Sequence, residues 1–364
     1  MTPAPILLLA RELNLGGTER QLAEIARSLD RARFDPRVGV YHPGGVRYEE
    51  LRSAGVPLLH VPVRSFLRPS FLSAAAGLAR YIRRERIALV HTYDPPLNAF
   101  GAPVARLAGG GVRVLTSARG SRKLVSSAMR QWLRWTDRMA DGIVVNCLAM
   151  RRELTGENGV PPERIHLCYN AVDPRVFFPA REKNDIPVIG CVCALRAEKG
   201  LKTLLRAFAR TPHAKLVLVG DGAEKPELQA LAASLSIGDR VRFEPGTANV
   251  VPWLQRIDIF VLPSLSEALS NSLMEAMACG CAPVASRVGG NPELVTDGEN
   301  GLLFPAGDDE SLASALNRLC DDELLRRRLA AASVSRIAGE FSLTAAARRM
   351  GEIYDSVLAG APVR

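Results

Sequence analysis

Short apolar runs of strand length recur along the chain, and a stretch with helical amphipathic spacing follows each of them. Because these runs are apolar at every position rather than at alternate ones, they are typical of strands buried on both faces of a parallel sheet. Apolar residues at i, i+3, i+4 spacing over 201–210 and 313–319 predict two of the covering helices. The predicted strands span residues 6–10, 88–90, 113–116, 142–146, 188–193, 216–220, 257–262 and 282–286.

This pattern is interrupted between residues 170 and 187, where Pro179 and a polar stretch precede a fresh strand. A chain of 364 residues has room for two domains with ordinary buried cores. We therefore expect an α/β protein with two Rossmann-like parallel-sheet domains, whose strand-to-helix loops face a shared cleft where ligands bind. The expected division is 1–172, 173–340 and a final helix within 341–364.

Composition excludes several classes of protein. Hydrophobic residues make up 47% of the chain, which rules out a disordered segment. No run approaches the roughly 18 apolar residues of a membrane-spanning helix, and the first ten residues lack the basic start of a signal peptide, so we expect a soluble, cytoplasmic protein. The cysteine pairs 191/193 and 279/281 lie in apolar stretches, which indicates buried, reduced thiols rather than disulfides or a zinc site.

The positive charge is concentrated in the first half. The formal charge is +9 overall, but residues 1–179 carry +11 and the remainder −2. A basic amphipathic helix interleaved with Trp132 and Trp135, together with an apolar loop at 66–72, could rest on an anionic membrane surface. The alternative is an arginine-rich surface over a helix whose tryptophans face the core. No nucleic-acid-binding motif accompanies the charge. The basic clusters are Arg80, Arg83, Arg84 and Arg86, and then Arg119, Arg122, Lys123, Arg130, Arg134 and Arg138.

Two strand-to-helix loops carry candidates for anion binding. Gly16 and Gly17 follow the first strand and could let the backbone approach a phosphate or sugar, with Thr18 capping the next helix; the alternative is a tight turn. Arg196 and Lys199 lie three residues apart before a predicted helix. Two such cations could clamp a diphosphate, and the alternative is a solvated charged loop.

A third loop carries two carboxylates. Glu267 precedes a helix that Ser270 or Asn271 would cap and Gly280 would end, and Glu275 lies within that helix. The loop carboxylate could contact one part of a ligand while the helical one reaches an adjacent part. The spacing alone occurs often by chance, so it does not assign a function.

The sequence around these two carboxylates resembles that of the retaining glycosyltransferases of family 4, which have the GT-B architecture. Glu267 and Glu275 match that family's E-x7-E motif, and the phrase from Ser266 to Ala278 agrees nearly throughout. The resemblance implies transfer of a sugar from a nucleotide-activated donor to an acceptor hydroxyl, with retention of configuration. It also implies that the final helix crosses back onto the first domain; the alternative is a plain terminal helix of the second. Further matching segments are 16–19, 170–173, 178–179, 196–200, 218–222 and 288–293.

Site roles follow from the resemblance. It assigns the ribose hydroxyls to Glu275, the donor sugar to Glu267, and the diphosphate to Arg196 and Lys199. Cations and the amides near Ser272 and Leu273 could stabilise the departing diphosphate, which gains charge as the bond breaks. The sequence shows no Asp-x-Asp or His-x-x-x-His pair, so we expect no metal and no cofactor. Family frequency favours UDP-hexose as donor.

The acceptor side is less defined. His91 falls where the family often has a histidine, and it is either a site residue or a satisfied structural one. Arg119 stands at or next to a second family histidine; it could bind a phosphate or carboxylate, or lie on the surface, and the proton-accepting group is unassigned. We expect a lipid-linked glycan or polysaccharide precursor as acceptor, with a soluble acceptor as the alternative. The competing functions are a sugar-nucleotide 2-epimerase of similar architecture and a non-catalytic nucleotide-sugar-binding protein.

Overall fold

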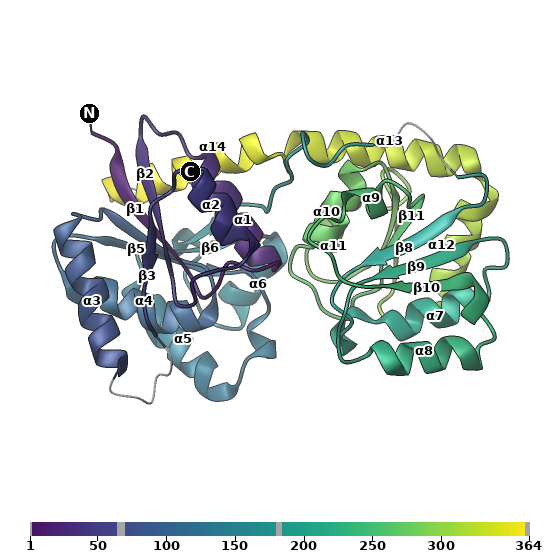
Figure 1. Ribbon diagram of the computed structural model, residues 1–364, viewed down its shortest axis with the longest axis horizontal. Coiled ribbons are helices and arrows are strands. Elements are labelled where there is room, and N and C mark those ends of the chain that lie inside the picture. The colour runs from purple at the N-terminus through teal and green to yellow at the C-terminus, as the bar shows by residue number, and fades with distance from the viewer. Residues whose placement is uncertain (1, 64–69, 180–183, 361–364) are drawn as a thin grey trace. The chain divides into compact units, whose positions relative to one another are not determined.

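The computed structural model describes residues 2–63, 70–179 and 184–360, and the chain divides into two compact units. The first unit comprises residues 1–170 together with 343–364, and the second comprises residues 171–342 (Figure 1). Each unit contains a parallel sheet covered by helices on both faces, so the predicted α/β class with two Rossmann-like sheets is confirmed. The expectation that both sheets face one cleft stays a prediction.

The first unit is built on a seven-stranded sheet in the order β3-β2-β1-β4-β5-β6-β7. All neighbouring strands are parallel, so their carboxyl ends lie along one edge. The strands are β1 (Ala4–Ala10), β2 (Phe34–Val40), β3 (Leu58–His60), β4 (Leu89–Thr92), β5 (Arg113–Ala118), β6 (Gly142–Val145) and β7 (Ile165–Leu167).

Helices cover both faces of this sheet. On one face α1 packs against α2 and α14, and on the other α4 packs against α3 and α5 (Figure 1). Leu9, Val90 and Val114 from the central strands pack with Phe100 of α4 in one buried core. The helices are α1 (Gly17–Ser28), α2 (Val46–Ser53), α3 (Ser70–Arg84), α4 (Pro95–Ala108), α5 (Ser127–Met139), α6 (Leu148–Gly156) and α14 (Leu343–Ala359), with short 3₁₀ turns at Arg122–Leu124 and Pro162–Arg164.

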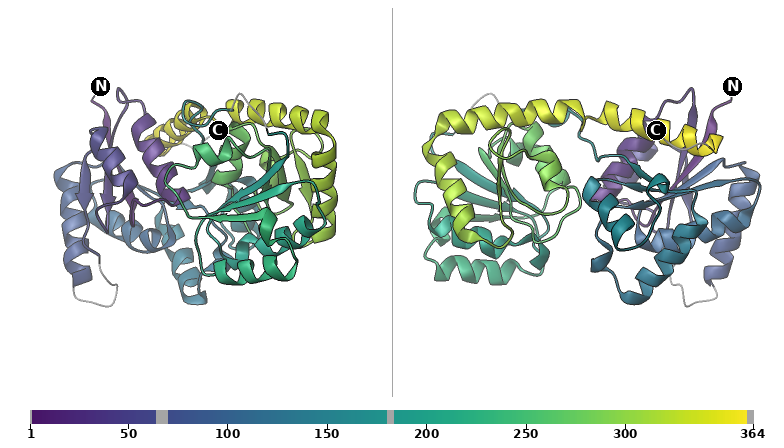
Figure 2. Two further views of the ribbon diagram at one scale, coloured as in Figure 1. Left: turned by 45° about the vertical axis from the view of Figure 1, so that its right-hand side comes forward. Right: turned by 180° about the vertical axis from the view of Figure 1, so that it is seen from behind.

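The final helix, α14, belongs to the first unit. It packs against α1 (Figures 1 and 2). A stripe that includes Met350, Ile353 and Tyr354 is buried, and the Tyr354 ring contacts Phe34 of β2. The stripe follows the helical spacing that the sequence shows. The predicted return of the terminal helix to the first unit is therefore confirmed.

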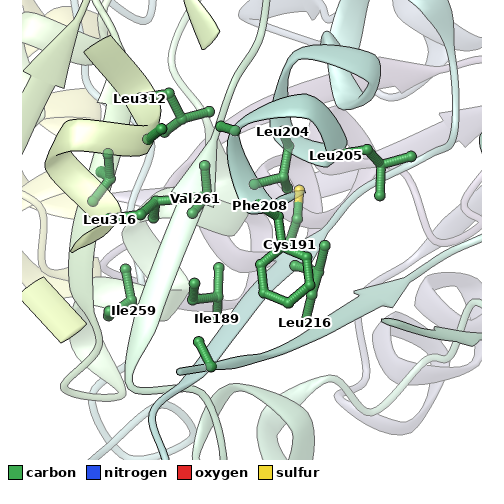
Figure 3. Close-up of a cluster of buried hydrophobic side chains, with 14 of the residues drawn as sticks. Ile189, Cys191, Leu204, Leu205, Phe208, Leu216, Ile259, Val261, Leu312 and Leu316 are labelled. Carbon is green, nitrogen blue, oxygen red and sulfur yellow. The ribbon is translucent and has the colours of Figure 1, made fainter. Parts of the chain in front are cut away.

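The second unit contains a six-stranded parallel sheet in the order β10-β9-β8-β11-β12-β13. On one face α7 packs against α8 and α12, and on the other α10 packs against α13. Figure 3 shows Leu204 and Phe208 of α7 meeting the strand residue Cys191 in its core. The strands are β8 (Val188–Val192), β9 (Lys215–Val219), β10 (Val241–Glu244), β11 (Ile259–Leu262), β12 (Ala282–Ser286) and β13 (Leu302–Phe304). The helices are α7 (Leu201–Ala209), α8 (Lys225–Ser234), α9 (Val251–Leu254), α10 (Asn271–Ala278), α11 (Asn291–Leu294), α12 (Asp309–Asp321) and α13 (Glu323–Gly339), with 3₁₀ turns at Ala197–Lys199 and Gly238–Arg240.

The basic helix expected over 119–138 is shorter than predicted. It starts only at Ser127, because the Ser126 hydroxyl accepts from the Met129 amide and caps it. Arg122 does not belong to a solvated basic face, since it forms a buried bidentate ion pair with Asp137 at 2.6 and 2.9 Å.

The tryptophans of α5 do not face the core. Trp132 and Trp135 are 49% and 45% exposed, and their rings contact each other at a tilt of 40°, with 4.9 Å between centroids. Leu133 between them is the buried residue. Of the apolar loop predicted at 66–72, residues 66–69 lie outside the described residues, whereas Phe71 contacts the Phe100 ring and Leu72 is exposed. Over the described ranges, no helix combines the length and the apolar character needed to cross a bilayer.

Candidate functional site

Two loops meet at the carboxyl edge of the second unit's sheet. The Leu265 amide in the β11–α10 loop donates to the Glu198 carbonyl in the β8–α7 loop at 2.8 Å. Gly200 permits this approach, because a Cβ there would come within 2.1 Å of the Pro263 carbonyl oxygen and its φ is 64°. The backbone thereby holds the Lys199 and Glu267 segments side by side.

Lys199 and Glu267 form an ion pair at this junction. The ammonium Nζ lies 2.7 Å from the Glu267 carboxylate, and the two side chains are 21% and 15% exposed. The Ser264 hydroxyl donates to the same carboxylate oxygen at 3.2 Å. Burial opposes the charge of Lys199, but Glu267 more than offsets it, so the pKa of Lys199 is raised and the group stays cationic.

Arg196 is not part of this pair. Its side chain is 68% exposed, and its guanidinium reaches the Glu198 carboxylate only at 4.0 Å. The two cations predicted to act as one clamp therefore occupy different environments. Lys199 is fixed in place, whereas Arg196 would have to be ordered by a ligand.

A third loop supports the Glu267 backbone from the side of β12. The Gly290 amide donates to the Ala268 carbonyl at 2.6 Å. Gly289 lies so close that a Cβ would come within 1.8 Å of the Glu267 carbonyl oxygen, and its φ is 52°. The glycine pair at 289–290 thus packs against the carboxylate-bearing loop.

Helix α10 carries the second carboxylate, Glu275, which is 6% exposed. Ser270 caps the helix as predicted, accepting from the Leu273 amide at 3.3 Å. That amide, proposed to face the diphosphate, is engaged by the cap, while the Ser272 hydroxyl lies 3.3 Å from that of Ser270. Gly280 follows the helix end with φ 77°, as the sequence predicts.

In the first unit, the glycine pair opens α1 as expected, but Thr18 does not cap it. Gly16 occupies the cap position, and no side chain hydrogen-bonds there. Its conformation is open to any residue, with φ −65°. The Glu19 carboxylate folds over this glycine, within 1.9 Å of where a Cβ would lie, so a larger residue would displace the end of that side chain.

His91 is a buried residue of the sheet, 0% exposed. Its Nδ1 lies 2.9 Å from the Tyr354 hydroxyl and its Nε2 lies 2.8 Å from that of Ser117. Burial first, and then the charge of Arg119, hold the pKa of His91 well below its usual range. The geometry matches the structural alternative, because both ring nitrogens are engaged and no face is open to a ligand.

Arg119 is partly buried and held by its neighbours. Its guanidinium stacks over the Tyr93 ring at 4.7 Å and donates to the Asn170 side chain at 2.8 Å. Nearby, the side-chain oxygen of Asn146 directly after β6 is buried without a hydrogen-bond partner in the described part of the chain. Fixed cationic and polar groups thus follow β4, β5 and β6 at one edge.

Sequence reasoning missed Asp94, which caps α4 by accepting from the Leu97 amide at 2.9 Å. Burial raises its pKa to about 6. The signal was available, because Asp followed by Pro95 and Pro96 is a helix-start pattern. Within the described ranges, no three His, Cys, Asp or Glu side chains gather closely enough to hold a metal ion.

Two family models match the chain side by side. The model of Glycosyltransferase Family 4 matches residues 15–176, and the model of Glycosyl transferases group 1 matches residues 173–336. Their boundary falls near the division between the two units at residues 170 and 171. The first match contains the glycine pair, His91 and Arg119, and the second contains Lys199, Glu267 and Glu275.

The chain is similar in sequence to two bacterial enzymes and in fold to a protein crystallised with UDP. Lipopolysaccharide core biosynthesis glycosyltransferase LpsE of Rhizobium meliloti is 36% identical over 178 residues, which are 49% of this chain and 51% of LpsE. The chain thus spans about half the length of that relative. N-acetyl-alpha-D-glucosaminyl L-malate synthase of Bacillus anthracis is 28% identical over 307 residues, 80% of each chain. The crystal structure of Anabaena HepE in complex with UDP has the same fold, with a TM-score of 0.86 at 22% identity over 97% of this chain and all of HepE.

Proposed function

Because the chain belongs to the glycosyltransferases, with a family 4 first half and a group 1 second half, we propose that it transfers a hexose from UDP-hexose to an acceptor hydroxyl with retention of configuration. We choose UDP because UDP-sugars are frequent donors in the family. This choice accords with the UDP-glucose complex of Anabaena HepE, whose fold this chain shares. The acceptor we propose is a lipid-linked glycan or polysaccharide precursor. No observation favours the 2-epimerase or the non-catalytic alternative.

The observation that carries this proposal is the Lys199–Glu267 pair at 2.7 Å. The pair presents a fixed positive charge beside a carboxylate at the carboxyl edge of the sheet. We assign Lys199 to the diphosphate, whose negative charge grows as the bond to the sugar breaks, and Glu267 to the hydroxyls of the donor sugar. A cation fixed before the reaction stabilises the transition state without reorganisation.

Other residues complete the donor site in this proposal. Glu275 accepts from the two ribose hydroxyls, since a carboxylate can bind a vicinal diol through both oxygens. Arg196 closes onto the diphosphate when the donor binds. Ser272, at the N-terminus of α10, presents its backbone amide to the same group. In the first unit, Gly16 and Gly17 approach the donor through their backbone. No metal or cofactor enters this scheme, and undiminished activity in excess EDTA is its test.

On the acceptor side we assign Arg119 to an anionic group, a phosphate or carboxylate. Tyr93 and Asn170 hold its guanidinium in place. An arginine stays protonated at neutral pH, so it binds the acceptor and does not remove its proton. His91 supports the strand beneath and touches no substrate in this scheme.

We further propose that the exposed face of α5 rests on an anionic membrane surface. Trp132 and Trp135 lie half exposed beside the exposed side chains of Arg134 and Arg138. Tryptophan favours the headgroup level, and each nearby basic residue contributes about 1 kcal/mol. Flotation with anionic vesicles at low and high salt tests the idea, with Trp132→Ala plus Trp135→Ala as the matched variant. Equal flotation of wild type and variant would refute it.

The donor assignment is tested by a thermal shift with UDP, GDP, ADP and NAD on wild type and Glu275→Ala. A ligand at about 100 times its dissociation constant adds about 2.7 kcal/mol, which raises the melting temperature measurably. We expect a shift with UDP that the substitution abolishes. A thermal shift with NAD alone, or no thermal shift with UDP, GDP or ADP, would refute the proposed function.

A further inference from the structure

Two cysteines on β8 bring their sulfur atoms into contact. Cys191 lies within the strand and Cys193 directly after it, so the two side chains lie on the same face. Their sulfur atoms are 3.6 Å apart. Cys191 is 1% exposed and packs beside Leu204 and Phe208 (Figure 3), whereas Cys193 is partly exposed. The sequence predicted buried thiols here, and Cys193 departs from that prediction.

The two thiols differ in their pKa values. The Cys191 thiol donates a hydrogen bond to the Cys193 sulfur, which lowers the pKa of Cys193 and raises that of Cys191. Burial opposes the thiolate at Cys193, and the charge of Lys199 favours it. The less buried residue of the pair thus carries the more acidic thiol.

Three other cysteines, Cys279, Cys281 and Cys320, lack this combination. Cys279 and Cys281 have the same spacing in the sequence, but both are 0% exposed, and the Cys281 thiol donates to the Leu254 carbonyl at 3.2 Å. Cys320 is partly exposed, but burial raises its pKa to about 11, so it stays protonated. The same C-x-C spacing therefore produces a reactive pair only where it falls on β8.

We propose that Cys191 and Cys193 form a dithiol site that captures trivalent arsenic between the two sulfur atoms. An arsenical R–As=O forms two As–S bonds and loses its As–O bond, and the oxygen leaves as water with both thiol protons. Arsenic is neither oxidised nor reduced. A pair held in contact by the strand binds by chelation without first ordering the two side chains.

Occupation of the dithiol site inhibits sugar transfer, a clause that rests on the proposed function. Cys193 directly follows β8, and the loop that begins there carries Lys199. A bulky arsenical on Cys193 therefore stands at the carboxyl edge of the sheet, where Lys199 and Glu267 form the ion pair assigned to the donor. Bound donor in turn protects Cys193 from the reagent.

The test is intact-mass measurement of the full chain with phenylarsine oxide. We expect one phenylarsenic group per chain, removed by 2,3-dimercaptopropanol but not by an equal thiol concentration of 2-mercaptoethanol. Cys193→Ser should weaken binding roughly 100-fold or more, because one sulfur cannot chelate. Cys320→Ser is the matched control and should bind as wild type does. Unchanged binding by Cys193→Ser would overturn the dithiol site.

Cys191→Ala provides a second variant, with a small apolar side chain suited to the core, and should lose binding equally. Inhibition is read separately, as the UDP thermal shift before and after loading with the arsenical. A loaded protein with an unchanged UDP shift would overturn the inhibitory clause alone. A protein that binds the arsenical but shows no UDP shift even before loading would count against the proposed function and leave the dithiol site standing.

Discussion

Nδ1 of His91 lies 2.9 Å from the hydroxyl oxygen of Tyr354, although 263 residues separate the two in the chain. The contact joins β4 to α14, and both groups are completely buried. It satisfies a polar atom on each side, and the second histidine nitrogen is satisfied by Ser117. The terminal helix is therefore attached to the first sheet by a directional contact as well as by apolar packing.

Replacing Tyr354 by phenylalanine should reveal the value of this contact. Tyr354→Phe keeps the ring but leaves a histidine nitrogen buried without its partner, at a cost of about 1–3 kcal/mol in the free energy of unfolding. Urea denaturation measures the loss. Tyr48→Phe, on the half-buried helix α2, is the matched control and should change little. Equal stabilities of the two variants would contradict the prediction.

The stability of the protein should fall as the pH drops below neutrality. Burial holds the pKa of His91 well below 6.5, and burial together with Arg349 and Arg151 lowers that of His166 to about 4. At a pH between the folded pKa and 6.5, each of these histidines is protonated in the unfolded chain but neutral in the folded chain. As the pH falls through this range, the stability that is present above pH 6.5 is therefore lost. His166 should account for about 2 kcal/mol between pH 7 and 5, and His91 should add a loss in the same direction. Urea titrations at both pH values should show a smaller drop for His166→Gln than for wild type, and equal drops would refute the assignment.

Lys199→Ala should lower kcat/KM for transfer, with a rise of about 2–4 kcal/mol in the activation free energy. The substitution removes the fixed positive charge that stabilises the departing diphosphate. Arg196→Ala should cost less, since that exposed side chain must first be ordered. Lys202→Ala, which removes the ion pairs of that lysine with Glu224 and Glu227, is the control. Full activity of Lys199→Ala would eliminate its assigned role.

Gly200→Ala should uncouple the two loops of the second unit. The added Cβ would collide with the Pro263 carbonyl oxygen, and the backbone conformation would be strained by about 1–3 kcal/mol. We expect activity to fall as in Lys199→Ala, with a lower melting temperature. Gly238→Ala is matched to it, because a Cβ there meets nothing within 4 Å. Wild-type turnover in Gly200→Ala would show that the loop contact is dispensable.

Arg122→Ala should be strongly destabilising. It leaves the Asp137 carboxylate, which is 5% exposed, without its bidentate partner. Breaking a buried pair on one side costs about 3–5 kcal/mol. Arg138→Ala on the exposed side of α5 is the control, and calorimetry of the two variants separates a buried pair from a surface charge. A change as small as that of the control would refute the burial of this pair.

The central strands could be predicted from the sequence, whereas the edge strands could not. Strands β1, β4, β5, β6, β8, β9, β11 and β12 coincide with predicted apolar runs to within a few residues. The missed strands are β3, β7, β10 and β13, which form the four sheet edges, and β2, which is next to an edge. An edge strand is covered on fewer sides, so its residues need not be continuously apolar. β2 alternates in burial over its first four residues, which include Asp35, Pro36 and Arg37.

The candidate site was predictable where one loop carries it and unpredictable where distant segments meet. Glu267 and Lys199 each belong to a motif, but their ion pair depends on the glycine that lets two loops touch. The role of His91 is set by Tyr354, which no local pattern connects to it. The contact between Cys191 and Cys193 depends on the side-chain direction in β8, and the identical spacing at 279 and 281 carries a different environment.

The discontinuity of the first unit has a consequence for synthesis on the ribosome. Residues 1–170 leave the ribosome before the second unit, yet α14, which packs on α1 and satisfies His91, is made only after the second unit. The second unit, which is continuous in the chain, can complete its core while the first still lacks a layer. Until residues 343–359 emerge, Phe34 and His91 of the first sheet lack the helix that covers them, and this interval is when the nascent first unit is most exposed to aggregation and to chaperones.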